Sequence, residues 1–190
     1  VFKPNNLSEL SIFLKNLKGS NKIKVLGAGS NTLIRDGGFD GIIVKFGKSF
    51  SHLSLLNKST LIAGASTLDK SVSNFASENS LSGFEFLSCI PGTIGGAIRM
   101  NSGCYGEDIS KILVSVQVMD LSGKVKVIYS SDIKFSYRSC DLDNNLIFIS
   151  ATFRGKNEKN NNIVKKINSL VKRKKKDQPS QIKTCGSTFK

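Results

Sequence analysis

CIPGTIGGAIRMNSGCYG, residues 89–106, is the stretch around which this chain is organised. It holds five glycines in eighteen residues, with small or hydroxyl-bearing side chains among the others. Glycine permits positive φ angles and lets other groups come close to the main chain. The stretch therefore predicts a surface of backbone N–H groups, which suits phosphates and other anions. The spacing is equally compatible with a structural interpretation, a turn at Pro91-Gly92 and a tight helix contact at Gly95-Gly96.

The length and composition limit the class of protein. At 190 residues and 39% hydrophobic, the chain can bury a real core in one domain or two small ones. There is no apolar run of about 18 residues, and residues 1–20 lack a signal-peptide pattern. We therefore expect a cytoplasmic protein that does not contact a membrane. The chain begins at Val1 and stops at Lys190, and we expect that both ends are cut or continue further.

The cysteines and the single histidine argue against a metal centre. Cys89, Cys104, Cys140 and Cys185 form no CxxC pair, and His52 is the sole histidine. This predicts neither a zinc site nor a Cys–His nucleophile, and we expect no metal. Without a secretory signal, free thiols are favoured over two disulfides.

The formal net charge of +14 raises the possibility of a nucleic-acid partner. Much of this charge lies in residues 165–176, especially the run VKRKKK. A solvated, basic helix end explains the run, and a basic site for a small polyanionic ligand is the main alternative. A nucleic-acid-binding module would bind a generic duplex in a salt-sensitive way. The chain carries no recognised nucleic-acid motif, so we expect no such partner.

Hydrophobic periodicity and turn residues predict an α+β chain. The predicted helices cover residues 6–17, 67–79, 93–99 and 162–175. The predicted strands cover residues 22–26, 41–46, 112–119, 124–128 and 146–153, with one more inside 55–63. Asn6 and Glu9 have the spacing of a capping box, and Thr67 is expected to cap the second helix. A domain boundary is expected near residues 48–54.

A second glycine-containing loop, GAGSNT at residues 27–32, follows the first predicted strand. It is not a Rossmann fingerprint, because Thr32 stands where the third glycine would be and no crossover helix follows. It is not a Walker loop either, because no GK[ST] follows. Its N–H groups and hydroxyls could still bind a diphosphate.

Two further segments could carry chemistry. The first is FSYR at residues 135–138. Its Arg138 is either a surface residue or a residue whose guanidinium forms paired hydrogen bonds to a carboxylate or an enolate oxygen. The second is TCGSTFK at residues 184–190. Ser187 has no Ser–His–Asp partners, so it is a poor hydrolytic nucleophile and a more credible proton donor.

Four segments together resemble one family. They are LGAGSNTLIRDGGFDGIIV (26–44), GFEFLSCIPGTIGGAIRMNSGCYG (83–106), FSYRSC (135–140) and CGSTFK (185–190). In this order they resemble the UDP-N-acetylenolpyruvoylglucosamine reductase (MurB) family, flavoenzymes that make UDP-N-acetylmuramate for peptidoglycan. The nearest alternative is another PCMH-type flavin oxidoreductase that oxidises a sugar or alcohol.

The resemblance implies an α+β, PCMH-type FAD-binding fold of two small α/β subdomains. Residues 1–50 would form the first subdomain and residues 51–175 the second. Residues 176–190 would be a linker and the start of a third, substrate-binding domain. The family's chain continues beyond this point and carries a catalytic glutamate that has no counterpart in residues 1–190. A chain that ended at Lys190 would be expected to bind FAD but to turn over little.

The resemblance also implies the chemistry, an NADPH-driven ping-pong reduction of UDP-N-acetylglucosamine enolpyruvate through FAD. Arg138 would stabilise the enolate and Ser187 would donate the proton, with Tyr137 and Lys190 binding substrate. FAD would be held without a covalent bond, since His52 lies outside both glycine loops. We expect a monomer. The residues expected to hold FAD are Gly27, Ala28, Gly29, Ser30, Asn31, Thr32, Pro91, Gly92, Thr93, Gly95, Gly96, Ala97, Asn101, Ser102, Gly103 and Gly106.

Overall fold

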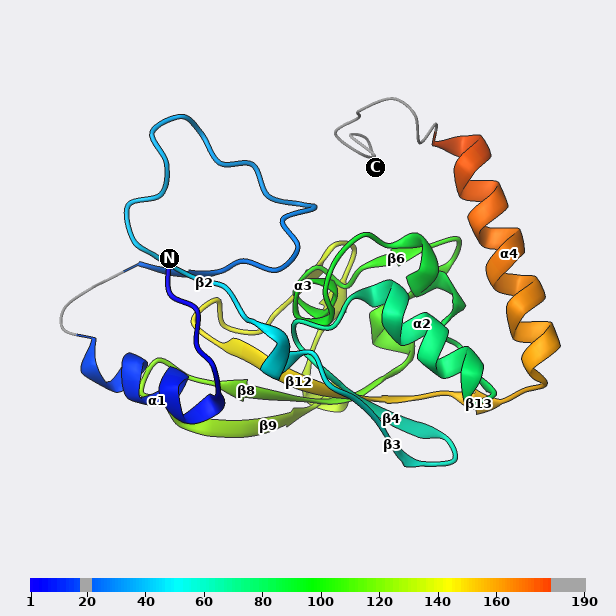
Figure 1. Cartoon of the computed structure of the whole chain (residues 1–190), viewed down its shortest axis with the longest axis horizontal. Coiled ribbons are helices and arrows are strands. Elements are labelled where there is room, and N and C mark those ends of the chain that lie inside the picture. Colours follow the sequence, from blue (N-terminus) through cyan, green and yellow to red (C-terminus); the bar gives the residue numbers. More distant parts are fainter. Residues whose placement is uncertain (18–21, 179–190) are drawn as a thin grey trace.

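The computed structural model describes residues 1–17 and 22–178, which form a mixed α and β structure (Figure 1). The helices are α1 (Leu7–Asn16), α2 (Asp69–Glu78), α3 (Ile94–Arg99) and α4 (Asn160–Asp177). The strands are β1 (Ile23–Val25), β2 (Ile42–Val44), β3 (Leu53–Asn57), β4 (Thr60–Gly64), β5 (Leu81–Ser82), β6 (Gly103–Cys104), β7 (Glu107–Asp108), β8 (Leu113–Met119), β9 (Val125–Tyr129), β10 (Phe135–Ser136), β11 (Ser139–Cys140), β12 (Ile147–Arg154) and β13 (Lys156–Asn157).

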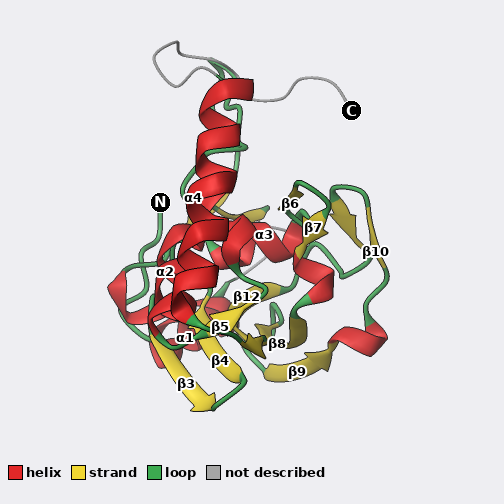
Figure 2. Cartoon of the chain, turned by 90° about the vertical axis from the view of Figure 1, so that its right-hand side faces the viewer, coloured by secondary structure: helices red, strands yellow, loops and turns green. Residues whose placement is uncertain are grey.

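A five-stranded antiparallel sheet in the order β3-β4-β12-β8-β9 forms the centre of the molecule. Helices α2 and α3 lie over one side of this sheet, and α4 extends beyond the body (Figures 1 and 2). Strands β1 and β2 pair in parallel, and the long connection between them contains the glycine loop 27–32. None of the described helices combines the length and the apolar character needed to cross a bilayer.

The first helix begins where its sequence signal predicts. The Asn6 side chain accepts a hydrogen bond from the Glu9 N–H at 2.8 Å, as an N-cap should. The Glu9 carboxylate accepts from the N–H of Asn5 at 2.8 Å, one residue earlier than a capping box requires. The predicted start of the helix is therefore confirmed, with the return bond shifted by one residue.

One local prediction is incomplete and another is wrong. The strand predicted inside residues 55–63 is present as β4, but β3 precedes it, because Asn57 accepts from the Ser59 N–H at 2.9 Å and turns the chain between β3 and β4. Thr67 does not cap α2, because it lies one residue before the N-cap position; its hydroxyl donates to the His52 carbonyl at 3.2 Å. The N-cap position belongs to Leu68, which has no side-chain group that could accept.

Two hydrophobic cores meet on strand β12. Phe148, Ala151 and Phe153 belong to the larger core beneath α2 and α3. Ile147 and Ile149 belong to the smaller core. The other buried members of the smaller core are Leu10, Leu14, Val44, Phe50 and Met119. Residues 1–50 therefore share a core with the sheet, and the division into subdomains near residue 50 stays a prediction.

Asp69, the first residue of α2, is fully buried, and neither carboxyl oxygen has a hydrogen-bond partner among the described residues. Burial without a partner disfavours the charged form and raises the pKa of Asp69 to about 7. Buried polar groups normally find partners, so a carboxyl that lacks one is costly to the fold when it is ionised.

Asp69→Asn should change how stability depends on pH. Between the ordinary pKa of 3.8 and about 7, the folded protein holds a proton on Asp69 that the unfolded chain has lost. Stability therefore falls as pH rises through this window. Relative to the Asn variant, the unfolding free energy of the cofactor-free wild type should drop by roughly 2–3 kcal/mol between pH 5 and pH 8. Urea unfolding at several pH values measures this difference, and a constant difference would contradict the assignment.

Candidate cofactor site

The two glycine loops found in the sequence meet in the structure. The Ser30 hydroxyl donates a hydrogen bond to the carbonyl oxygen of Pro91. A Cβ atom added to Gly27 would collide with the hydroxyl oxygen of Thr93, so this approach needs glycine. Loop 27–32 and loop 91–93 therefore form one continuous surface.

This surface presents a set of main-chain N–H groups with no acceptor among the described residues. They belong to Gly27, Ala28, Gly29, Ser30, Asn31, Gly92, Thr93 and Gly96. Main-chain N–H groups without a protein acceptor are free to bind an anion such as a phosphate. The anion-binding surface expected from the sequence is therefore compatible with the main chain here and stays a prediction.

A cavity of about 380 Å³ opens beside the two loops. Its volume is in the range of sites for small molecules and cofactors. Five of the residues expected to hold FAD line it. They are Gly27, Ala28, Thr93, Gly95 and Gly96. The other eleven lie outside its lining.

The sequence missed much of this cavity wall. The missed residues include Val25, Phe46, Leu68, Arg99 and residues 144–148. Val25 lies two residues before loop 27–32, and Arg99 lies within the glycine-rich stretch, so the sequence position of each pointed to the site. Residues 144–148 belong to no motif, and only the folding of the chain brings them to the cavity.

Arg99 connects these missed residues to the glycine-rich stretch. Its guanidinium donates to the carbonyls of Leu142 at 2.6 Å, Asp143 at 3.0 Å and Leu146 at 3.0 Å. It also lies 4.6 Å from the centre of the Phe148 ring. One side chain of α3 thereby fixes the segment that closes one wall of the cavity.

The glycines of residues 89–106 have different roles. A Cβ on Gly95 would lie 3.3 Å from the Cβ of Ala65, and one on Gly103 would lie 2.6 Å from the Cβ of Asp108. Gly106 has a φ angle of +86°. Ala97, between them, is buried in the core. The tight helix contact expected at Gly95-Gly96 is therefore present at Gly95 and not at Gly96, and both glycines line the cavity.

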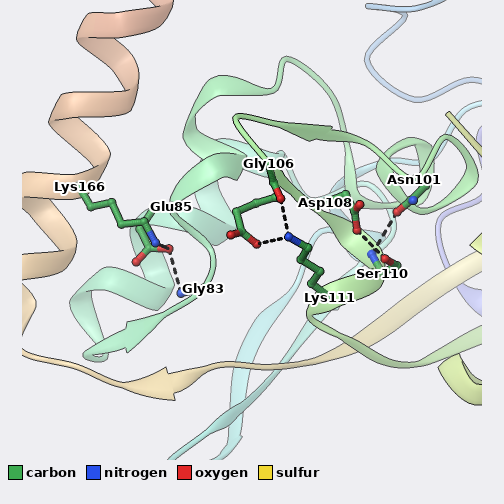
Figure 3. A network of polar contacts seen from close by, with 9 residues as sticks. Gly83, Glu85, Asn101, Gly106, Asp108, Ser110, Lys111 and Lys166 are labelled. Carbon is green, nitrogen blue, oxygen red and sulfur yellow. Dashed lines mark hydrogen bonds and ion pairs between the residues drawn. The ribbon is translucent and has the colours of Figure 1, made fainter. Parts of the chain in front are cut away.

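Asn101 uses its side chain to hold protein segments together. Its amide nitrogen donates to the Ser136 carbonyl at 3.2 Å. Its amide oxygen accepts from the Ser110 N–H at 3.1 Å, as Figure 3 shows. Asn101 is 8% exposed and has a φ angle of +38°. It therefore fixes the β10–β11 hairpin against the glycine-rich stretch.

That hairpin carries Tyr137 and Arg138 at its tip. Both residues are exposed, and the Arg138 guanidinium lies 5.5 Å from the centre of the Tyr137 ring. The nearby thiol of Cys104 remains protonated at neutral pH, because burial raises its pKa to about 11 despite the positive charges of Lys174 and Arg138. Ser187 and Lys190, the other two residues expected at the reaction site, lie outside the described residues.

The basic helix α4 is bound to the same region. Lys174 donates to the carbonyl of Cys89, at the start of the glycine-rich stretch. Lys166 pairs with the buried Glu85 at 3.5 Å (Figure 3), and Arg173 lies 4.4 Å from the centre of the Tyr105 ring. Part of the basic run therefore makes structural contacts.

Comparisons with known proteins agree with this geometry. The family model described as "FAD binding domain" matches residues 1–129. The chain is 49% identical, over its whole length, to the UDP-N-acetylenolpyruvoylglucosamine reductase of Pelagibacter ubique. It is 39% identical, over 99% of its length, to the enzyme of the same name from Rickettsia canadensis. It spans 63% of the length of each of these relatives.

A solved structure has the same fold. The crystal structure of UDP-N-acetylenolpyruvylglucosamine reductase (MurB) from Thermus caldophilus matches with a TM-score of 0.86 and 27% identity. The match covers 99% of this chain and 66% of that one. The α+β class and the PCMH-type fold expected from the sequence are confirmed, and the family model covers more than half of the chain. The chain belongs to the FAD-binding domain family, and its cofactor is FAD.

Proposed function

We propose that this chain acts in the NADPH-driven reduction of UDP-N-acetylglucosamine enolpyruvate to UDP-N-acetylmuramate. The observation that carries the proposal is the joining of two glycine loops beside a cavity, in a chain 49% identical to a reductase of that name. The reaction would supply a precursor of peptidoglycan, and so support cell shape and division. We propose that it takes place in the cytoplasm and that the protein is a monomer.

The residues present fit FAD. Unpartnered N–H groups of loops 27–32 and 91–93 suit its diphosphate, and the cavity walls formed by Val25, Phe46 and Leu68 suit an aromatic ring. Gly27, Ala28 and Thr93 belong to both features, so the N–H groups of the loops and the cavity adjoin. FAD, when bound, supplies the hydride chemistry of the reaction.

The protein's own part is to bind charge and to deliver a proton. Arg138, held by the Asn101-supported hairpin, would fork onto the substrate carboxylate and stabilise negative charge that develops beside it. Ser187 would donate a proton to the neighbouring carbon, and Tyr137 and Lys190 would contact the substrate. The same pocket would receive NADPH and then the enolpyruvyl substrate, with no nucleic acid or membrane partner.

The purified complete protein should release its yellow chromophore on denaturation, because FAD is held without a covalent bond. Absorbance of the supernatant after acid precipitation measures this release. With FAD bound, NADPH should be consumed steadily only when UDP-N-acetylglucosamine enolpyruvate is present. A chromophore that stays on the chain, or turnover of a simple sugar with oxygen, would instead favour a PCMH-type oxidase.

Arg138→Ala in the complete protein should slow oxidation of the reduced flavin by the enolpyruvyl substrate by about 10²-fold or more. Reduction of the flavin by NADPH should stay within about twofold of wild type. Arg154→Ala, at the exposed end of β12, is the matched control and should change neither step. Stopped-flow absorbance separates the two half-reactions, and an equal loss in both would point to a structural role.

Ser187→Ala should leave flavin reduction by NADPH nearly intact. The second half-reaction should slow by about 10²–10⁴-fold, since general acid catalysis contributes this much. Ser187→Cys, which retains a proton donor of similar size, should recover part of the rate. The same stopped-flow assay measures both variants. Unchanged reoxidation in the alanine variant would exclude the serine as donor.

A further inference from the structure

Among the described residues, the buried side-chain polar atoms that lack a hydrogen-bond partner lie at Asp69 and at nearby Ser73. Three buried side-chain atoms there have no hydrogen-bond partner, namely both carboxyl oxygens of Asp69 and the hydroxyl oxygen of Ser73. Asp69 and Ser73 are one turn apart on α2, and both are essentially inaccessible to solvent. Such a cluster in a native fold calls for an explanation, because buried polar groups are normally satisfied.

The Asp69 carboxyl lies directly behind the joined glycine loops. The point where a Cβ of Gly92 would stand is 2.8 Å from a carboxyl oxygen of Asp69 and 3.7 Å from the Ser30 hydroxyl. The Asp69 N–H donates to the Gly92 carbonyl at 3.2 Å, which fixes α2 to the loop. A group bound to the N–H groups of Gly92 and Thr93 would therefore approach this carboxyl closely.

No cation offsets the charge of this carboxyl among the described residues. Loop 90–93, which contacts Asp69 through Gly92, and loop 27–32, which is joined to it, carry no titratable side chain. Lys70, the neighbour of Asp69 on α2, has an exposed side chain. His52 is also exposed, and it contacts Thr67 through its main-chain carbonyl and not through its imidazole ring. Burial is the sole cause of the raised pKa of Asp69.

We propose that Asp69 is a further determinant of cofactor binding, and that FAD binds with uptake of one proton at this carboxyl. A diphosphate on the loops carries negative charge that does not titrate near neutral pH, and a carboxylate behind the same loop would repel it. The proton taken up forms one O–H bond on Asp69, and no other bond changes. Neutral Asp69 is then the form that accepts the cofactor, so binding weakens as pH rises. This inference rests on the FAD-binding part of the proposed function.

Calorimetric titration of the cofactor-free protein with FAD tests the inference. Repeating the titration in two buffers of different ionisation enthalpy gives the number of protons taken up per FAD. Wild type should take up close to one proton near pH 8 and almost none near pH 5, and its Kd should rise by up to about tenfold per pH unit above neutrality. FAD binding without proton uptake at any pH would overturn the inference. Absence of FAD binding at every pH would instead overturn the proposed function.

Two variants identify the group that takes up the proton. Asp69→Asn should bind FAD with no proton uptake and with a Kd that is independent of pH, and at pH 8 it should bind more tightly than wild type. Glu85→Gln replaces the other buried carboxyl, which is paired with Lys166, and should keep the wild-type uptake. Uptake that persists in Asp69→Asn would overturn the inference. If that variant does not fold, the wild-type series still decides whether a proton is taken up, and Asp69→Ser replaces it.

Discussion

The contact between loop 27–32 and loop 91–93 is the constraint on which the site depends. Gly27 must lack a side chain because the Thr93 hydroxyl occupies that space, and Ser30 closes the contact by donating to Pro91. Apart from that of Gly96, the main-chain N–H groups of the site that have no acceptor among the described residues belong to these two loops. The loops come from segments more than sixty residues apart, so the site exists only once the whole fold is assembled.

Much of this arrangement was predictable from the sequence, because a glycine indicates a local backbone property: positive φ angles or close approach of another group. Dense glycine with hydroxyl side chains indicated N–H surfaces, and periodicity indicated most helices and strands. Thr67 was misread because the helix begins one residue later, with Leu68 at the N-cap position, and the Thr67 hydroxyl donates to the His52 carbonyl. Residues 144–148 and Asp69 were missed because they reach the site only through tertiary packing.

Several residues near the site act by positioning others. Arg99 binds three carbonyls of the cavity wall, and Asn101 joins the hairpin of Arg138 to the glycine-rich stretch. Lys174 fixes the basic helix to the beginning of that stretch. Loops that carry functional groups thus depend on polar side chains for their position, because irregular backbone has few ladder bonds of its own.

The sharing of a core through β12 has a consequence during synthesis of the chain. Leu10, Leu14 and Val44 leave the ribosome early, but Ile147 and Ile149, which complete their core, follow about a hundred residues later. The N-terminal segment therefore waits with apolar side chains exposed, the condition in which chaperones bind nascent chains. The contacts of this core also join residues far apart in the sequence. Such contacts slow folding, because the entropy cost of closing the long loop precedes the favourable energy of the contacts.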